Sequence, residues 1–343
     1  MESLVDEDLR ELIAQGRVGP GLEGHIQPAS IDIPLGPTAY LVTQKFLPFS
    51  SDVASLAKSF AIERIDLSKG AVFLRGQTYL VKCIDLNLPP DLHVRISPKS
   101  SIGRIDVLVR AVADRNGLYD RVLGGYRGEL WLEITPNSYN IRVEQGIALS
   151  QLRVVRSRGS VDQPTFLYNE RGEPVKHEWF TPGKALLHLE VSGHVGYEGV
   201  FTNEVIDLSR RDVDPRTFFR RIGAERNVTL EKDRFYILTT KERISIPPDL
   251  SGEMVPFFHL VGELRVHYAG FFDPGFGHPV ANVGVLEVRP QETLTVYDGQ
   301  PICLMELYPH ARNVAVPYGD AGNNYATQHG PRLAKYFDER RRV

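Results

Sequence analysis

The chain has 343 residues, of which 42% are hydrophobic and 24% are charged, with a formal net charge of −3. This length is enough for two ordinary domains that each bury a core, and the composition is that of a globular protein. A charge this close to neutral argues against a protein that coats nucleic acid or an anionic membrane. No run approaches the roughly 18 apolar residues of a membrane span, so we expect no nucleic-acid partner and no membrane partner.

The two cysteines, Cys83 and Cys303, lie far apart in apolar stretches. They offer no disulfide framework, which favours a reducing compartment. Residues 1–8 are acidic and lack the apolar core of a signal peptide. These features predict a cytoplasmic protein.

The first predicted element is a short N-terminal helix. Residues 4–13 carry apolar side chains at helical spacing, with Asp6 placed to cap the helix and Gly16 placed to end it. Afterwards, short runs of alternating apolar and polar residues, such as 130–134, are separated by Gly, Pro and Asp, as is typical of strands. The 30 glycines and 23 prolines are spread through both halves, so we expect an all-β barrel or sandwich in each half.

Several short motifs occur twice, in the same order. Residues 89–92 and 247–250 both read Pro-Pro-Asp-Leu, and Leu-Glu-Ile at 132–134 is followed by Leu-Glu-Val at 286–288. In two further matches, residues 67–70 correspond to residues 230–233, and residues 143–147 correspond to residues 296–300. The repeats predict a tandem duplication, with a first domain over residues 1–156, a linker over 157–184 and a second domain over 185–343.

The first copy carries more of the side chains that a nucleotide site needs. It has hydroxyls and cations at residues 99–104 (Lys-Ser-Ser-Ile-Gly-Arg). The second copy has Phe-Phe-His-Leu, residues 257–260, where the first has Lys-Ser-Ser-Ile. Glu133 and Glu287 occupy matching strand positions. We therefore predict one competent site per chain, in the first copy.

Taken singly, these residues also have plainer structural explanations. A Ser-Ser pair near Pro is more often a turn with local hydrogen bonds. Arg104 could form a salt bridge in a barrel, and Glu133 could lie on a solvated strand face. Ser55 to Lys58 fits the Ser-x-x-Lys pattern of acyl-enzymes without its companion motifs, which indicates a helical turn. His188 to Glu190 gives half of a zinc-deaminase signature, but two distant cysteines cannot supply the other half.

Together, the motifs resemble those of the dCTP deaminases of the trimeric dUTPase superfamily. Residues 29–36 are similar to the first motif of that family, residues 100–104 to its Ser-Ser-x-x-Arg motif and residues 325–330 to its C-terminal lid, and Glu133 falls where the family carries its catalytic glutamate. A longer, duplicated form of dCTP deaminase exists, and this chain looks like one. The resemblance implies a mainly β fold of two tandem dUTPase-like distorted β-barrel (β-clip) domains with a short N-terminal helix.

The resemblance also implies roles for individual residues. Glu133 would act as general acid and base, and Arg104 and Ser100 would orient it and stabilise the charge that develops. The substrate-binding residues that it implies are Lys99, Ser101, Ala113, Asp120, Tyr318, Tyr325 and Gln328. Mg²⁺ would be bound with the triphosphate, held mostly by phosphate oxygens and water, and no metal site of protein ligands is implied.

The implied reaction is hydrolytic deamination of dCTP to dUTP and ammonia, in pyrimidine deoxynucleotide biosynthesis and without zinc. dTTP or dUTP are further implied ligands, and a homo-oligomer, with a trimer favoured, is the implied assembly. Two residues depart from the family pattern, since Lys99 replaces an arginine and Asn324 replaces a lysine.

Two alternatives stay open. Residues 126–129 (Tyr-Arg-Gly-Glu) are closer to the dUTPase version of their hairpin, which favours a dUTP diphosphatase or a bifunctional enzyme that converts dCTP to dUMP. The second alternative is a nucleotide-binding regulator without catalysis.

Overall fold

A computed structural model gives the chain as two compact units. Unit 1 comprises residues 1–158 and 203–213, and unit 2 comprises residues 159–202 and 214–343. The structure describes residues 2–156, 167–169, 171, 173, 184–256, 264–266, 270–310, 312–320, 324–325, 328–338, 340–341 and 343. Most of the predicted linker and the motif at 257–260 therefore lie outside the described residues.

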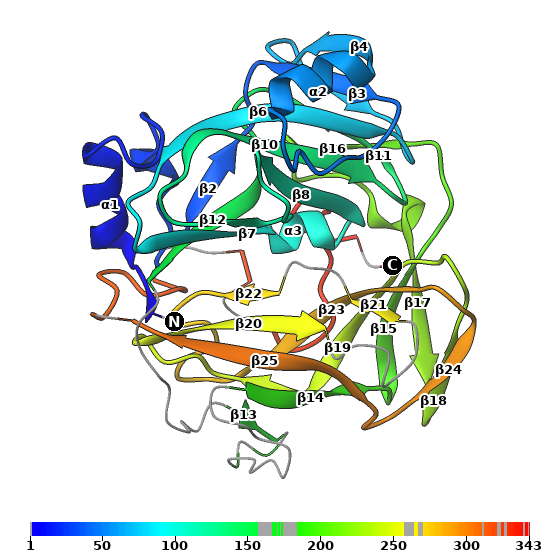
Figure 1. The fold of residues 1–343 in the computed structure, drawn as a ribbon. Coiled ribbons are helices and arrows are strands. Elements are labelled where there is room, and N and C mark those ends of the chain that lie inside the picture. The colour runs from blue at the N-terminus through cyan, green and yellow to red at the C-terminus, as the bar shows by residue number, and fades with distance from the viewer. Residues whose placement is uncertain are drawn as a thin grey trace. The chain divides into compact units, whose positions relative to one another are not determined.

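Unit 1 contains two helices of more than two turns (Figure 1). Helix α1, Asp6–Ala14, begins after Val5, whose N–H donates to the Asp8 carboxylate at 3.1 Å, and Gly16 turns the chain with a φ of 64°. The predicted helix is confirmed, but its N-cap is Val5 rather than Asp6. Helix α2, Val53–Phe60, contains the Ser-x-x-Lys sequence, so the predicted helical turn is confirmed. Across the described residues, no helix is long and apolar enough to cross a membrane.

The rest of unit 1 is built mainly of strands in three sheets. The orders are β4-β3-β6-β10-β8, β1-β12-β7-β9 with β2 on β12, and β16-β11-β5. The strands are β1 Glu2–Ser3, β2 Ile31–Pro34, β3 Thr38–Val42, β4 Ala61–Asp66, β5 Ala71–Phe73, β6 Thr78–Asn87, β7 Leu92–Pro98, β8 Val107–Ala113, β9 Arg121–Val122, β10 Arg127–Pro136, β11 Asn140–Val143, β12 Ala148–Arg156 and β16 Val205–Asp207. Short helices are η1 Glu23–His25 and α3 Ser100–Gly103.

Unit 2 repeats this strand order. Its strands pair as β17-β15-β19-β23-β21, as β14-β25-β20-β22 and as β18-β24. The strands are β13 Leu167–Tyr168, β14 Lys184–Glu190, β15 Gly193–Gly199, β17 Phe219–Ala224, β18 Asn227–Leu230, β19 Tyr236–Ile244, β20 Leu250–Pro256, β21 Leu264–Val266, β22 Phe271–Phe272, β23 Asn282–Pro290, β24 Leu294–Tyr297 and β25 Pro301–Pro309, with one short helix, η2 Pro215–Thr217. The mainly β fold and the two-domain architecture are confirmed.

Two local structures fix how the copies correspond. The Tyr79 hydroxyl accepts a hydrogen bond from the N–H five residues before it at 2.8 Å, and the Tyr236 hydroxyl accepts the same bond at 2.9 Å. Between donor and acceptor, Gly76 and Asp233 both have left-handed backbones, with φ of 79° and 61°. Tyr79 therefore corresponds to Tyr236, and Gly76 to Asp233.

This correspondence corrects one of the matches made from sequence. Residues 230–233 are equivalent to residues 73–76, not to residues 67–70. In both copies the left-handed residue that ends this segment precedes the hydrogen-bonded tyrosine by the same number of residues. The error arose because Gly70 ends a similar lysine-containing turn and is also left-handed, with a φ of 71°. The match of 143–147 with 296–300 holds, since Gly146 and Gly299 donate to Leu35 and Leu189 at 2.9 Å each.

The connections between equivalent strands differ. In unit 1 the link from β3 to β4 contains α2. The link from β15 to β17 instead contains residues 203–213, which belong to unit 1. There β16 pairs in parallel with β11, and the Leu208 N–H donates to the Arg142 carbonyl at 3.1 Å.

Candidate active site

Glu133 is a buried carboxylate on a strand of the five-stranded sheet of unit 1. It lies on β10, opposite Leu80 of β6 and Arg110 of β8, and its residue exposure is 2%. Trp131, two residues earlier, points to the same face. The apolar cluster on this face consists of Val42, Val53, Ala57, Leu80, Val112 and Trp131, so α2 covers part of it. The interpretation of Glu133 as a residue on a solvent-exposed strand face is therefore wrong.

Two polar side chains reach the Glu133 carboxylate. The Tyr119 hydroxyl donates to Oε2 at 3.4 Å, and the Lys45 Nζ lies 3.8 Å from Oε1. Burial raises the pKa of Glu133, while the positive charges of Lys45 and Arg110 and the Tyr119 hydrogen bond act in the opposite direction. Burial also raises the pKa of Tyr119 to about 12, so its hydroxyl remains a donor at neutral pH. Glu133 can thus bind and release a proton in a mainly apolar setting.

Asp120 is held next to this carboxylate. Its side chain accepts from the Ala111 N–H at 2.7 Å and pairs with the Arg110 guanidinium, which lies 4.4 Å from the centre of the Tyr119 ring. Its left-handed backbone, with a φ of 61°, allows its own N–H to donate back to Ala111 at 3.0 Å. Ala113, at the end of the same strand, pairs with Leu130 of β10. The structure therefore places Asp120 near Glu133, and Ala113 at the end of the neighbouring strand β8.

The residues around α3 form a second group in unit 1. Ser101 and Arg104 are buried, and the Lys99 ammonium forms an ion pair with Asp32. Within the described part of the chain, the polar partners of the Glu133 carboxylate are Tyr119 and Lys45. Ser100 and Arg104 of the same chain therefore do not reach it.

The three predicted residues of the C-terminal lid belong to unit 2. Tyr318 packs against Phe276 with ring centres 5.7 Å apart, and the Tyr325 hydroxyl accepts from the Lys335 N–H at 3.1 Å. Gln328 is buried and donates from Nε2 to the Val283 carbonyl at 2.8 Å. Their contact with a triphosphate stays a prediction.

Three residues of the site were missed from the sequence. Arg110 lies directly across from Glu133, so the register of the two strands would have identified it. Tyr119 immediately precedes the predicted Asp120. Lys45 comes from the link between β3 and β4, far from the other site residues in sequence, and no motif marks it.

Comparison with known proteins identifies the family. The family model described as the N-terminal domain of 2'-deoxycytidine 5'-triphosphate deaminase matches residues 3–158, and the model of its C-terminal domain matches residues 176–337. The chain belongs to the dCTP deaminase family. It is an enzyme that deaminates dCTP.

Solved structures and curated relatives agree with this. The crystal structure of 2'-deoxycytidine 5'-triphosphate deaminase from Agrobacterium tumefaciens superimposes with a TM-score of 0.82 and 32% identity, covering 91% of this chain and 98% of that one. The "dCTP deaminase, dUMP-forming" of Nocardia farcinica is 31% identical over 47% of this chain and 80% of its own length. The "dCTP deaminase" of Natronomonas pharaonis is 25% identical over 47% of this chain and 84% of its own length.

Proposed function

We propose that Glu133 is the general acid and base of this dCTP deaminase. The observation that carries the proposal is a carboxylate buried among apolar side chains, with cations close enough to keep ionisation accessible. In the reaction, Glu133 takes a proton from the water that attacks C4 of cytosine. It gives this proton to N3, then takes the second proton from the C4 hydroxyl of the tetrahedral intermediate and passes it to the amine, which departs as ammonia and leaves dUTP. Such a proton shuttle typically contributes ~10²–10⁴-fold to the rate.

Asp120 and Ala113 are the substrate contacts closest to this carboxylate. Asp120 is fixed by two partners, the Ala111 N–H and the Arg110 guanidinium, which suits a residue that must orient the deoxyribose 3′-hydroxyl. Ala113 presents its backbone at the strand end, where it can accept a hydrogen bond from the base or the water. Preorganised groups of this kind act without reorganising during the reaction.

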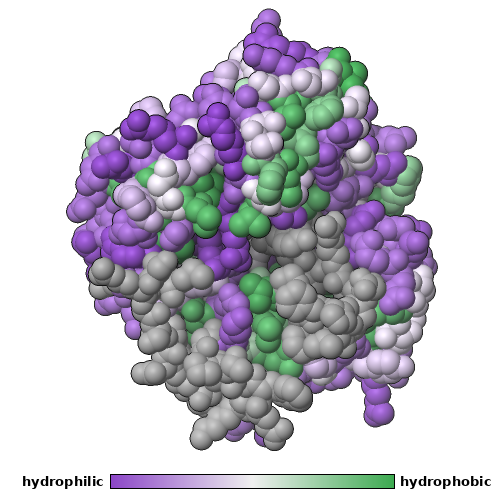
Figure 2. All heavy atoms as spheres, viewed as in Figure 1, coloured by the Kyte–Doolittle hydropathy of each residue, from purple (hydrophilic) through white to green (hydrophobic). Residues whose placement is uncertain are grey.

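The site is completed by another copy of the chain. Ser100 and Arg104 do not reach Glu133 within one chain, so their assigned roles in holding the intermediate require a second protomer in a homo-oligomer, for which we favour a trimer. An apolar patch near the site supports such an assembly, because Leu47, Phe49 and Leu118 are exposed and the Phe49 ring lies against Gly117. Figure 2 shows apolar surface near α2. Exposed apolar patches of this kind commonly mark interfaces.

The triphosphate would enter as its Mg²⁺ complex in the cytoplasm. The candidate contacts are Lys99, Ser101, Tyr318, Tyr325 and Gln328, and dTTP or dUTP would compete for them. The described residues contain no group of three or more His, Cys, Asp or Glu side chains that could hold a metal ion. In the proposal, phosphate oxygens and water hold the ion.

A second product is favoured by the relatives. The Nocardia farcinica protein is named as dUMP-forming and the Natronomonas pharaonis protein is not. In this chain two hydrogen bonds hold the hairpin that resembles dUTPases, since the Tyr126 hydroxyl accepts from the Asp114 N–H at 3.1 Å and donates to the Glu129 carbonyl at 2.8 Å. A bifunctional enzyme that continues from dCTP to dUMP is therefore the second candidate.

Two parallel incubations separate these candidates. The purified chain is mixed with Mg²⁺ and either dCTP or dUTP, the nucleotides are resolved and ammonia is assayed. dUTP with an equal amount of ammonia supports the proposed reaction, and dUMP with pyrophosphate supports the bifunctional enzyme. Cleavage of dUTP with dCTP left intact would contradict the role of Glu133, and no change in either nucleotide would favour a non-catalytic regulator.

A further inference from the structure

Unit 2 has a cavity on the sheet face that carries Glu287. Glu287 of β23 pairs with Ile237 of β19, and Ile237 pairs with Tyr197 of β15. Tyr197 in turn pairs with Arg221 of β17. Directly opposed residues of antiparallel strands point to the same face. Arg221 and Tyr197 therefore share a face with Glu287, as Arg64 and Tyr40 share one with Glu133 in unit 1.

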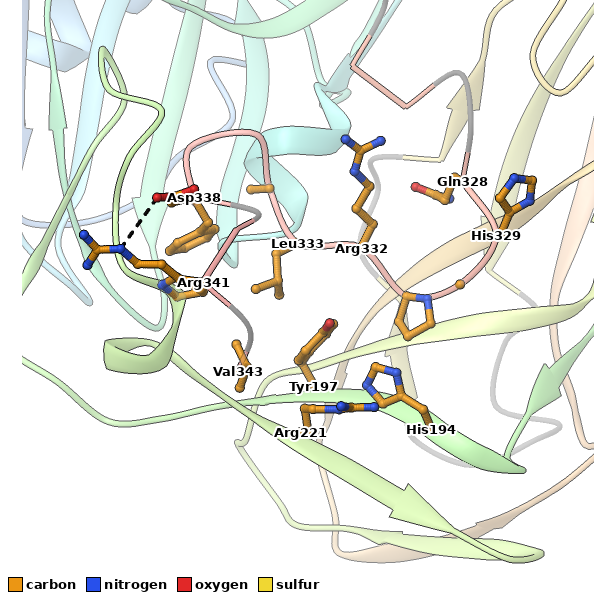
Figure 3. A pocket seen from close by; sticks show the side chains of 15 residues that line it. His194, Tyr197, Arg221, Gln328, His329, Arg332, Leu333, Asp338, Arg341 and Val343 are labelled. Carbon is orange, nitrogen blue, oxygen red and sulfur yellow. Dashed lines mark ion pairs between the residues drawn. The ribbon is translucent and has the colours of Figure 1, made fainter.

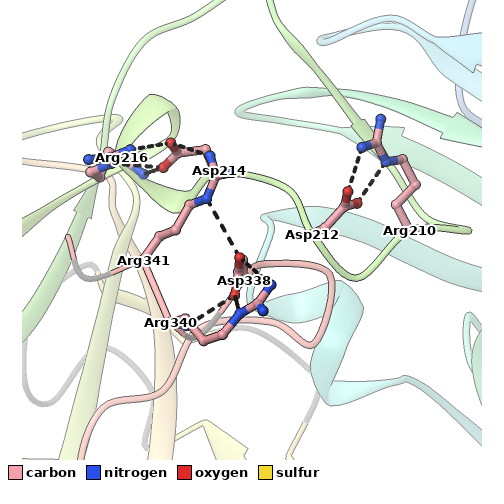
Figure 4. A network of polar contacts seen from close by, with 7 residues as sticks. All are labelled: Arg210, Asp212, Asp214, Arg216, Asp338, Arg340 and Arg341. Atoms are coloured by element: carbon pink, nitrogen blue, oxygen red, sulfur yellow. Dashed lines mark hydrogen bonds and ion pairs between the residues drawn. The ribbon is translucent and has the colours of Figure 1, made fainter.

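This face has a different cover in the two units. In unit 1 it is α2, whereas in unit 2 it includes the described residues of the C-terminal segment, 328–338, 340–341 and 343. Phe337 of this segment packs on Phe218 and Phe219, with ring centres 5.7 and 5.4 Å apart. Figure 4 shows how its end is fastened, since Arg341 pairs with Asp214 at 3.0 Å and with Asp338 at 3.6 Å.

The segment does not fill the space above the sheet. A cavity of about 470 Å³ remains, with His194, Tyr197 and Arg221 on the strands and residues 328–334 along its other side (Figure 3). A second cavity of about 170 Å³ shares its His194 wall and continues along β19, where Thr239, Lys241 and Arg243 line it. The two neighbouring cavities share His194 and residues 329–331 in their linings and are here called, together, the β15–β19 groove. The larger cavity is in the size range of small-molecule sites.

The charges of the groove favour an anion. Among the described residues, neither Arg221 nor Arg243 forms an ion pair with a carboxylate. The acidic groups of the lining are already engaged, because Asp338 accepts from Arg340 at 2.8 Å and Glu190 accepts from the Ser192 hydroxyl. The positive charge of Arg221 reaches into the groove, since it helps burial to lower the pKa of His194.

We propose that the β15–β19 groove binds a small molecule that carries a polyphosphate, with Arg221 and Arg243 as its phosphate contacts. A guanidinium presents two parallel donors to a phosphate, which a lysine cannot match. The Tyr197 ring, at the floor of the groove, offers an apolar surface to the rest of the ligand. This site lies in unit 2 and does not depend on the role of Glu133, although one of the triphosphate contacts proposed above, Gln328, also lines it. Inorganic polyphosphate and nucleoside polyphosphates share the required chemistry.

The test is a count of binding sites on the full chain by calorimetry at physiological salt. Inorganic tripolyphosphate and ATP are titrated separately into the native protein and into Arg221→Gln, Arg243→Gln and Arg226→Gln. Arg226 is the matched control, because it is an exposed arginine of the same unit that lines neither cavity. We expect one class of sites to weaken at least tenfold in the first two variants and to remain in the third. Binding of tripolyphosphate alone would assign the site to polyphosphate, and a tighter ATP complex would assign it to nucleotides.

Chemical footprinting of the native chain tests the same site without depending on the folding of the variants. Phenylglyoxal modifies arginines, and its attack on Arg221 and Arg243 in the native chain should be slowed by saturating tripolyphosphate, with Arg226 unaffected. Equal binding by all three variants, or no protection of Arg221 and Arg243, would overturn the proposal.

Discussion

Exchanging each buried glutamate for glutamine tests which copy is catalytic. Glu133 and Glu287 lie at equivalent positions, opposite Leu80 and Ile237, and each has a residue exposure of 2%. Glu133→Gln preserves shape and can still accept from Tyr119, but it cannot take a proton from water. We expect its turnover of dCTP to fall by ~10²–10⁴-fold, the usual contribution of a general acid–base. Glu287→Gln should remain within about threefold of the native rate, because no substrate role is assigned to it.

The Glu133 change should alter the stability of the fold only slightly. The carboxylate loses an ion pair to Lys45, whose side chain is 41% exposed, so the pair contributes at most ~1 kcal/mol after solvent screening. Steady-state kinetics with ammonia detection gives the rates, and thermal unfolding of all three proteins shows that each is folded. Equal losses in the two variants, or more than a tenth of native activity in Glu133→Gln, would refute the assignment of the general acid–base.

Three further predictions concern the same region and the fold. Burial raises the pKa of Glu133 above its usual value of 4.5, so this group stabilises the fold below that pH and loses the contribution as pH rises through its folded pKa. Denaturant unfolding should therefore show Glu133→Gln gaining stability relative to the native chain as the pH rises from 4.5. Tyr119→Phe removes a hydrogen bond that lowers the pKa of Glu133. The acidic limb of the pH–rate profile should therefore move to higher pH, and kcat should fall by roughly tenfold or less. An acidic limb that does not move would contradict the contact between Tyr119 and Glu133. Asp233→Gly removes the backbone strain of a left-handed aspartate at the position that Gly76 occupies in unit 1. It should raise the free energy of unfolding by about 0.5–1 kcal/mol in urea, whereas Gly76→Ala should lower it.

Much of the fold could be predicted from the sequence because its signals are local. Alternating runs, glycine turns and the recurring Pro-Pro-Asp-Leu identify strands and their order in each half. The β16 strand could not be predicted in the same way. Its three residues, Val205–Asp207, have no distinctive pattern, and their partner β11 is Asn140–Val143, more than sixty positions earlier.

The candidate site was partly predictable for the same reason. Glu133 and Asp120 stand in recognisable motifs, but Lys45 acts on Glu133 only through the tertiary fold. The false match of residues 67–70 to 230–233 shows that local sequence similarity can also align the two copies wrongly. A left-handed turn can be formed by Gly76 or by Asp233, so composition alone could not align the copies, whereas the tyrosine hydroxyl that binds each turn could.

The two copies indicate which part of the fold makes a site. Both keep the central strands and a buried glutamate in the same register. What surrounds that glutamate in unit 1 comes from connections, because Lys45 lies in the link from β3 to β4 and Tyr119 in the loop after β8. In unit 2 the corresponding link contributes β16 to unit 1, and the C-terminal segment covers the sheet instead. Catalytic residues on variable connections over a retained scaffold are the general way in which one fold acquires different sites. Loss of the β3–β4 type of link therefore explains why a retained Glu287 need not be catalytic, and why its face is open to another ligand.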